Sequence, residues 1–271
     1  MFRRELFRRM AQALDALDAN VLAQSSFHFG GGTYLALAHG EYRLSRGLDF
    51  ICSDAEGYAE LRFSVRERGY DALFPAARRT DPGFPWEIRT DQDGLRFPVR
   101  VEGVSIRVEM IREGRITLGA AEHAAWTTVP LLSMADAFAE KLLANSDRWA
   151  DRDDLARDLV DLAVLRMAHG PIPETAWAAT ERAYRSGPIT DLRKAGWLAS
   201  SWASEMSPLT ITPSAPVAAM RSQNVAIPGA SRKPRWISVT QARFMVSSLC
   251  RWLPVGHRCH HHFGHPVSTE G

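Results

Sequence analysis

The sequence lacks the features that mark several classes of protein. Among its 271 residues, no apolar run reaches the roughly 18 residues that a membrane-spanning helix needs. Three cysteines, Cys52, Cys250 and Cys259, are too few for a disulfide framework, which favours a reducing environment. The charged N-terminal residues are not followed by the apolar segment of a secretory signal. We therefore expect a cytoplasmic protein that does not associate with a membrane.

Acidic residues are absent from residues 207–269, which hold seven Lys and Arg. The net charge of the whole chain is +2, so residues 1–206, with 26 Lys and Arg against 30 Asp and Glu, are mildly acidic. This balance argues against a nucleic-acid surface over the whole chain, although a basic arm can supply one. Residues 207–271 are also rich in Pro, Ser and His, and we expect them to be poorly ordered. Their cysteines and histidines have no paired-ligand spacing that would predict a zinc site.

Residues 1–130 combine helical and strand patterns. Apolar residues three and four positions apart predict one helix over residues 3–23. Turn signals at Asp93-Gly94 and Glu102-Gly103 predict a β-meander over residues 85–111. The remaining predicted elements are two short strands and a helix that Asp54 caps: 25–29, 48–52 and 55–68.

Beyond Pro130 the pattern becomes helical. Ser133 is a suitable N-cap for a helix that runs through Lys141 to about Ser146. Apolar spacing predicts three further helices: 151–169, 174–184 and 190–204. We therefore predict the α+β class, with a mixed sheet and flanking helices in residues 1–130, a helical domain in residues 131–206 and a basic tail in residues 207–271.

Three consecutive glycines, Gly30, Gly31 and Gly32, separate the first predicted strand from a short helix that begins at Thr33. Without a Cβ, the backbone of such a turn can approach a ligand closely. The helix that follows presents free N–H groups and the positive end of its dipole, and Thr33 adds a hydroxyl donor, a combination that suits phosphate. A tight strand-to-helix turn that binds no ligand is the alternative interpretation.

Two acids lie on predicted strands that are otherwise apolar. Asp49 is flanked by apolar residues, and Glu109 lies in a segment that alternates apolar and charged residues. Because burying an ionised carboxylate is costly without a compensating cation, both acids need a partner. Beside a phosphate-binding turn they could hold Mg²⁺, which prefers oxygen ligands. The alternative is a structural ion pair with Arg43, Arg46 or Arg107.

Taken together, these segments resemble the AbiEii/AbiGii-type toxin family of nucleotidyltransferases, which share the DNA polymerase beta-like nucleotidyltransferase fold. The resemblance covers roughly residues 20–200 and rests on separated motifs in the order of the family: 29–33, 40–50, 106–111, 140–145 and 151–162. Their order is specific, whereas any one of them alone is not. The resemblance implies that the predicted sheet is nucleotidyltransferase-like.

The resemblance also implies roles for individual residues. Three groups follow from it: a triphosphate-binding set of Gly31, Gly32, Thr33, Arg43 and Ser45; the metal ligands Asp49 and Glu109; and the catalytic residues Asp49, Glu109, Lys141 and Asp158. Lys141 would neutralise phosphate charge or help to activate the acceptor, and Asp158 would match the acid of the late helix motif.

The helical motifs contain side chains that share a face. Lys141, Asn145 and Arg148 have the spacing i, i+4 and i+7, and their common face either points into the cleft or is solvated. Arg157 and Asp161 are spaced to form an i, i+4 pair that stabilises their helix.

The chemistry implied by the resemblance is transfer of a nucleoside monophosphate from a nucleoside triphosphate to a tRNA or protein acceptor, with Mg²⁺ or Mn²⁺ as cofactor and a cognate antitoxin as partner. The sequence departs from the family pattern at Gly47, where the first metal-binding Asp is expected. We therefore expect weakened transfer. The alternatives are a catalytically inactive relative that binds nucleotide, nucleic acid or a partner protein, and a sugar or antibiotic nucleotidyltransferase on the same fold.

Overall fold

The structure is a computed structural model that describes residues 2–75, 83–151 and 155–205. Its N-terminal elements are α1 (Glu5–Ala16), α2 (Ala19–Gln24), β1 (His28–Gly30), α3 (Gly31–Ala38), β2 (Gly47–Cys52), α4 (Ala55–Arg68) and η1 (Gly69–Ala72). The later strands are β3 (Arg89–Thr90), β4 (Gly94–Val101), β5 (Val104–Arg112), β6 (Glu122–Ala124) and β7 (Thr127–Leu131). The later helices are α5 (Met134–Arg148), α6 (Leu155–His169), α7 (Glu174–Tyr184) and α8 (Gly187–Glu205).

The strands form one mixed sheet of seven strands, in the order β3-β4-β5-β2-β1-β7-β6. β1 pairs antiparallel with β2 and parallel with β7, and β2 pairs parallel with β5. The sheet therefore places β2 between β1 and β5, although β1 and β5 are far apart in the sequence. The predicted α+β class and mixed sheet are confirmed.

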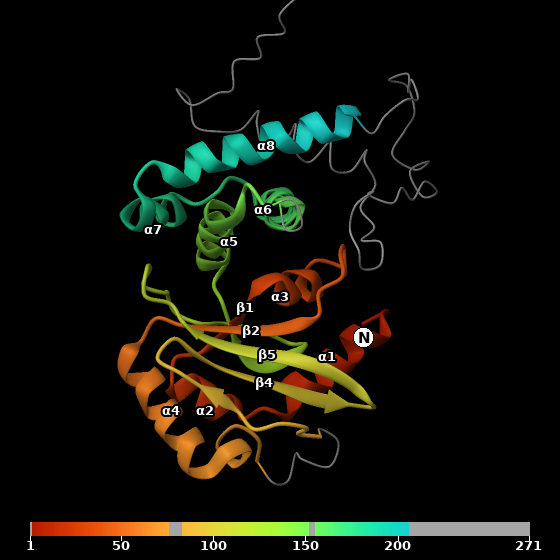
Figure 1. Ribbon diagram of the computed structural model, residues 1–271, viewed down its shortest axis with the longest axis vertical. Coiled ribbons are helices and arrows are strands. Elements are labelled where there is room, and N and C mark those ends of the chain that lie inside the picture. The colour runs from red at the N-terminus through yellow and green to blue at the C-terminus, as the bar shows by residue number, and fades with distance from the viewer. Residues whose placement is uncertain (1, 76–82, 152–154, 206–271) are drawn as a thin grey trace, which may run out of the picture.

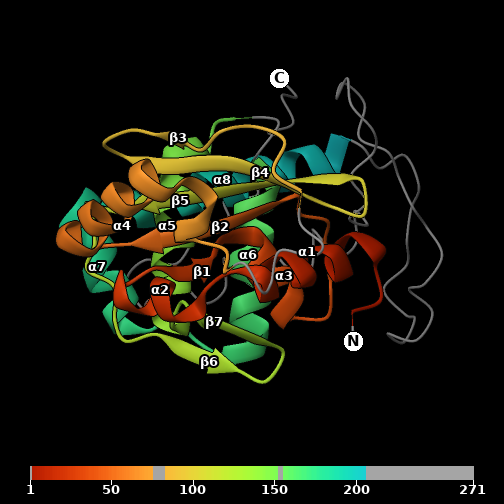
Figure 2. The same cartoon turned by 90° about the horizontal axis from the view of Figure 1, so that it is seen from below.

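Helices cover both faces of the sheet (Figure 1). α1, α2 and α4 lie on one face, and α3 lies on the other, beneath α5 and α6. The view from below in Figure 2 shows α2 and α4 across the strands of the first face. The arrangement buries a continuous apolar core, with Phe7 and Met10 of α1 on one side and Phe29 and Phe50 of the strands fully enclosed. In β5 the alternation predicted from the sequence is confirmed, because Ile106, Val108 and Met110 are buried.

The predicted single helix over residues 3–23 is wrong. The chain forms two helices, because Leu17 takes an extended conformation at the end of α1 and Asp18 caps α2 by accepting hydrogen bonds from the backbone of Asn20 and Val21. A side-chain oxygen at an N-cap satisfies amides that would otherwise have no helical partner. The other predicted caps, Asp54 of α4 and Ser133 of α5, are confirmed.

The transition from sheet to helices falls near residue 130. The predicted boundary at residue 130 lies within β7, and α5 begins three residues after that strand ends. The division into domains stays a prediction, and the whole of the predicted tail, residues 207–271, lies outside the described residues. Within the described ranges, none of the helices combines the length and the apolar character needed to cross a membrane.

Two acids, Glu113 and Glu140, lie close together where α5 passes the end of β5. Glu113, just after β5, accepts hydrogen bonds from Arg115 at 2.6 and 2.9 Å, and Glu140 of α5 lies beside it. Burial raises the pKa of Glu140 to about 8, and the negative charge of Glu113 acts in the same direction. Burial would also raise the pKa of Glu113, but Arg115 reverses the effect and holds it below its ordinary value. The two acids therefore keep one proton between them at neutral pH.

Replacing Glu140 with Gln should flatten the pH dependence of stability. In the wild type, the pKa of Glu140 is raised in the folded state, so its contribution is fully present below the ordinary pKa of 4.5 and is lost as the pH rises toward about 8. Gln preserves the shape of the protonated acid and does not titrate. Thermal unfolding between about pH 5 and pH 8 should show a smaller fall for Glu140→Gln than for the wild type. The exposed variant Glu181→Gln is the control, and parallel curves for all three proteins would contradict the assignment.

Candidate functional site

The glycine turn and the two predicted metal ligands meet at the centre of the sheet. β1 ends at Gly30 and α3 begins at Gly31, so the turn lies where the sheet passes into the helix above it (Figure 1). Asp49 of β2 is in register with Gly30 on one side and with Glu109 of β5 on the other. The fold thus brings together the predicted phosphate-binding turn and both predicted carboxylates.

The glycines of the turn leave room for side chains of the protein itself. A Cβ at Gly31, where φ is +67°, would lie 2.5 Å from Oδ2 of Asp49. A Cβ at Gly32 would overlap the guanidinium group of Arg43. A side chain at position 31 is therefore excluded by backbone conformation and by Asp49, and one at position 32 is excluded by Arg43 as long as Arg43 keeps its place.

Thr33 and Ser45 occupy different environments in the same region. Thr33 is fully buried, and its hydroxyl donates a hydrogen bond to the carbonyl oxygen of Gly47. This contact ties the first turn of α3 to the start of β2. Ser45 is half-buried in the loop that joins the two elements. The structure thus gives the Thr33 hydroxyl a protein partner, and its role toward phosphate stays a prediction.

Arg107 lies beside the position where the expected carboxylate is missing. Gly47 is in register with Arg107 of β5. Two residues further along the strands, and on the same face of the sheet, Asp49 is in register with Glu109. A Cβ at Gly47 would lie 3.4 Å from both Nε and Nη2 of Arg107, and Nη1 of Arg107 is 3.4 Å from Oε1 of Glu109. The guanidinium group would therefore be in van der Waals contact with the first side-chain atom of an Asp at position 47.

The electrostatic surroundings of Asp49 follow from this geometry. Burial raises the pKa of Asp49, Arg107 provides the largest opposing effect, and Glu109 reinforces the rise. Of the ion-pair partners considered from the sequence, Arg43 binds Asp161 instead, at 2.5 and 2.7 Å, and Arg46 is exposed. Arg107 is therefore the main counter-charge of Asp49.

Asp161 of α6 is the centre of a buried charge cluster. Its carboxylate accepts hydrogen bonds from Arg43 and, at 2.5 Å, from the Tyr42 hydroxyl, and Nζ of Lys141 is 2.6 Å away. Burial alone would raise the pKa of Asp161, but Lys141 and Arg43 outweigh it and lower the pKa to about 2. Burial would lower the pKa of Lys141, and Asp161 and Asp158 raise it above its ordinary value. Asp161, Lys141 and Arg43 are therefore all charged at neutral pH.

Asp158 of α6 adds a second carboxylate to the cluster and contacts two residues of α5. It accepts a hydrogen bond from Lys141 at 3.0 Å and two from Arg148 at 2.6 and 3.0 Å. Lys141 and Asn145 are both buried, so the predicted common face of α5 points toward α6 and is not solvated at these positions. The side-chain amide of Asn145 has no hydrogen-bond partner among the described residues. Lys141 and Asp158 thus lie together, and their predicted catalytic roles stay predictions.

The sequence reasoning missed Asp161 and Tyr42 as members of the site. Asp161 was expected to pair with Arg157 within its own helix, whereas its strongest contacts are with Arg43, 118 residues earlier, and with Lys141. The available signal was the pair of acids three residues apart, Asp158 and Asp161, because this spacing places both on one face of a helix.

The donor groups fit a divalent cation only in part. Asp49 and Glu109 are adjacent oxygen donors of the kind that Mg²⁺ prefers. No cluster of three or more Asp, Glu, His or Cys suited to a metal ion occurs among the described residues. Asp49 and Glu109 thus offer two protein ligands, and metal binding at this place stays a prediction.

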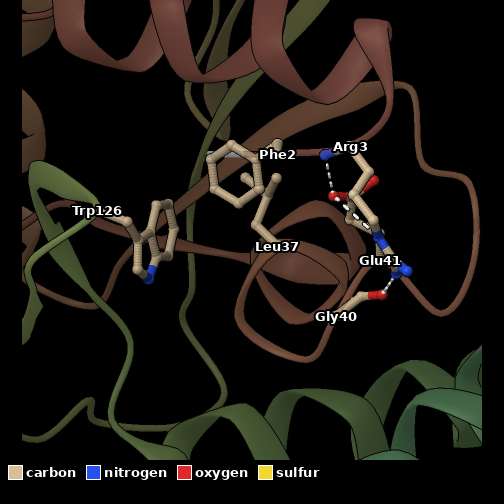
Figure 3. Close-up of a pocket in the computed structure, with 6 residues that line it drawn as sticks. All are labelled: Phe2, Arg3, Leu37, Gly40, Glu41 and Trp126. Atoms are coloured by element: carbon tan, nitrogen blue, oxygen red, sulfur yellow. Dashed lines mark hydrogen bonds and ion pairs between the residues drawn. The ribbon is translucent and has the colours of Figure 1, made fainter.

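A separate surface pocket lies at the opposite end of α3 from the glycine turn (Figure 3). It has a volume of about 510 Å³ and is lined by Phe2, Arg3, Leu37, Gly40, Glu41 and Trp126. Figure 3 shows Arg3 turned toward Glu41 and Gly40. Glu41 is buried and accepts hydrogen bonds from the backbone of Arg3 and Arg4, which fixes the start of α1. The residues that line the pocket include none of the predicted site residues.

Comparisons with known proteins identify a family and similar folds. The family model described as nucleotidyl transferase AbiEii toxin, type IV TA system, matches residues 12–213. A putative nucleotidyltransferase from Helicobacter pylori has 13% sequence identity and a TM-score of 0.51, with 92% of this chain and 94% of that chain covered. JHP933 from Helicobacter pylori has 15% identity and a TM-score of 0.48, over 75% and 79% of the two chains. No curated protein matches the chain. At these identities the structural likeness concerns the fold.

Replacing Asp161 with Asn should destabilise the protein strongly. The change keeps the size of the side chain but leaves Arg43 buried without its counter-charge and takes from Lys141 one of its two carboxylate partners, which costs about 3–5 kcal/mol. Urea unfolding at neutral pH measures the loss. The control is Asp191→Asn, which removes a surface ion pair with Lys194 and should cost less than about 1 kcal/mol. Equal small losses in both variants would show that the cluster does not stabilise the fold.

Replacing Gly32 with Ala should also destabilise the protein, because the new methyl group would displace Arg43 from Asp161. Each hydrogen bond to a charged group that is lost costs about 1.5–3 kcal/mol. This exceeds the gain of about 1 kcal/mol that alanine has over glycine within a helix. Gly187→Ala is the matched control, since Gly187 also lies at the start of a helix and a Cβ there makes only ordinary contacts, the nearest at 3.6 Å. Urea unfolding should separate the two variants, and a stabilised Gly32→Ala protein would contradict the packing described.

Proposed function

Because the chain belongs to the AbiEii family of nucleotidyl transferase toxins, whose model matches residues 12–213, we propose that it transfers a nucleoside monophosphate from a nucleoside triphosphate to a tRNA or protein acceptor. The single observation that carries the proposal is the convergence of the glycine turn with Asp49 and Glu109 at the centre of the sheet. These are the groups that the proposed reaction needs beside the phosphates.

The proposed binding mode follows from the start of α3. The backbone amides of Gly31 and Gly32 and the positive end of the helix would hold the triphosphate. Arg43 would hold this turn in place, because its guanidinium group lies against Gly32 and is itself bound by Asp161 of α6. Ser45, in the loop before β2, remains in the proposal as a second polar group at the edge of the site.

The proposed reaction is a displacement at the α-phosphate. An acceptor hydroxyl forms the new P–O bond, the bond between the α- and β-phosphates breaks, pyrophosphate leaves, and the hydroxyl proton passes to solvent or to a nearby carboxylate. Asp49 and Glu109 would hold Mg²⁺ or Mn²⁺, which when bound supplies positive charge beside the phosphates. Catalysis would then consist mainly of positioning and charge neutralisation.

Lys141 and Asp158 enter the proposal through the buried cluster. Lys141 contacts both Asp158 and Asp161, and Asp161 in turn holds Arg43 at the glycine turn. This chain of contacts supports a role in placing the turn. Direct neutralisation of phosphate by Lys141 would require it to leave two carboxylates within a buried environment, which is costly.

Gly47 supports the proposal that transfer is weak in this chain. Position 47 has no side chain to offer a metal ion, and Arg107 lies beside it. Loss of a metal ligand that acts in the transition state costs several kcal/mol, which corresponds to a rate lower by about 10³-fold or more. The same observation favours the second candidate function, that of an inactive relative that binds nucleotide, nucleic acid or a partner protein without turnover.

Two further proposals concern the surroundings of the protein. A toxin of a toxin-antitoxin system would act together with a cognate antitoxin. We retain the cytoplasm as its proposed location, on the grounds of the low cysteine content.

Gly47→Asp should increase nucleotide transfer. The substitution fits sterically, because a Cβ at this position makes ordinary contacts with Arg107, and it restores the missing carboxylate. With radiolabelled nucleoside triphosphates, Mg²⁺ and total tRNA, we expect little transfer by the wild type and a gain of up to about 10³-fold for the variant. The double variant Gly47→Asp with Asp49→Asn is the control and should be inactive.

The transfer assay and the melting temperatures of both proteins with nucleotide together separate the two candidate functions. Equally robust transfer by the wild type and Gly47→Asp would show that position 47 does not limit the reaction. Nucleotide binding without transfer in either protein would favour the inactive relative, because binding to the folded state raises its melting temperature whether or not turnover follows.

A further inference from the structure

Arg107 combines three properties that the rest of the site does not explain. It is the residue paired with Gly47 across β2 and β5. Its guanidinium group lies 3.4 Å from a carboxylate oxygen of Glu109. It also lies 3.4 Å from the place that the Cβ of a side chain at position 47 would take. Its side chain is nevertheless 65% exposed, so the group can reach a molecule that binds from solvent.

The charges of the site require a cation at this place. Asp49 and Glu109 bring two negative charges beside the glycine turn, and a nucleoside triphosphate would bring about four more. Arg43 is largely neutralised by Asp161. Arg96, 4.0 Å from Glu109, pairs more closely with Asp91, at 2.7 Å, so both arginines contribute little net charge. Without a further cation, the two carboxylates would repel the phosphates. Arg107 supplies a positive charge next to both of them.

We propose that Arg107 is a binding residue for the triphosphate, and that its guanidinium group takes over part of the task of the metal ion for which Gly47 provides no ligand. Triphosphate binding should therefore persist without a divalent cation. The inference rests on the proposed function, because it takes the glycine turn as the place of the phosphates. It adds the ligand-binding residue and the loss of metal dependence.

The chemistry of arginine suits this task. A guanidinium group stays charged at all physiological pH values and donates two parallel hydrogen bonds to phosphate oxygens. Its present contact with Glu109 is long and largely exposed, and such surface ion pairs contribute little free energy. Exchanging the contact with Glu109 for a phosphate would therefore cost little, provided that the group stays beside Asp49, whose main counter-charge it is.

The test is equilibrium binding of the four common radiolabelled nucleoside triphosphates and of inorganic tripolyphosphate, in Mg²⁺ and in EDTA. In the wild type we expect at least one nucleotide to bind in EDTA within about threefold of its affinity in Mg²⁺, and tripolyphosphate to compete with it. Arg107→Gln should weaken binding in EDTA by about tenfold or more, the loss expected for a bidentate charged contact. The affinity of Arg107→Lys in EDTA should lie between those of the wild type and Arg107→Gln, because lysine keeps the charge but not the paired donors.

The matched control is Arg66→Gln, which removes an exposed arginine of α4, on the opposite face of the sheet, and should bind like the wild type. Melting temperatures of the unliganded proteins verify that each variant is folded. Binding that requires Mg²⁺ in the wild type, or an Arg107→Gln protein that binds normally in EDTA, would overturn the inference and leave the proposed function intact. Absence of nucleotide binding under both conditions would overturn both.

Gly47→Asp provides an independent second variant. The new carboxylate would lie against Arg107 and should engage it, so binding in EDTA should fall about as much as in Arg107→Gln. The double variant Gly47→Asp with Arg107→Gln should bind nucleotide only with Mg²⁺, because it has three carboxylates and no competing guanidinium group. Undiminished binding in EDTA by either variant would contradict the assignment.

Discussion

The buried carboxylate of Asp161 is the contact on which the site depends. It fixes Arg43 against the glycine turn and holds Lys141 on α5, so it links the helical half of the chain to the sheet. A buried charge of this kind is stable only when its partners are complete, since removing one of them leaves an uncompensated ion in a medium of low polarity. The cluster therefore fixes the position of α3 relative to α5 and α6 by electrostatics as well as by apolar packing.

The glycine turn shows how a ligand-binding pattern can have a structural cause. The sequence left open a phosphate-binding turn and a tight turn without ligand. In the structure, the spaces left by two missing Cβ atoms are taken by Asp49 at Gly31 and by Arg43 at Gly32. The glycines are thus explained by side chains of the chain itself. Under the proposed function, a phosphate would be bound by the backbone amides at the start of α3 and not by the space of the missing side chains.

The parts of the fold that could be predicted are those that local chemistry determines. The alternation in β5, the caps at Asp54 and Ser133 and the hairpin turn at Glu102-Gly103 each depend on a few neighbouring residues. The break between α1 and α2 was missed because the apolar spacing continues across it, although the backbone of Leu17 takes an extended conformation. The role of Asp161 was missed because its main partner, Arg43, is distant in sequence, and partner choice of this kind is decided by tertiary structure.

The pairing of Gly47 with Arg107 has a consequence for how the site can change. Successive same-face pairs across β2 and β5 are Gly47 with Arg107 and Asp49 with Glu109, so the missing carboxylate and the arginine belong to one rung of the ladder. Side chains on one rung interact directly, and a carboxylate at position 47 would compete with Glu109 for the guanidinium group. Restoring the acid alone would therefore create an ion pair as well as a metal ligand. Under the proposed function, the acid alone would therefore restore metal binding only in part, and replacing Arg107 as well would free the new carboxylate for an ion.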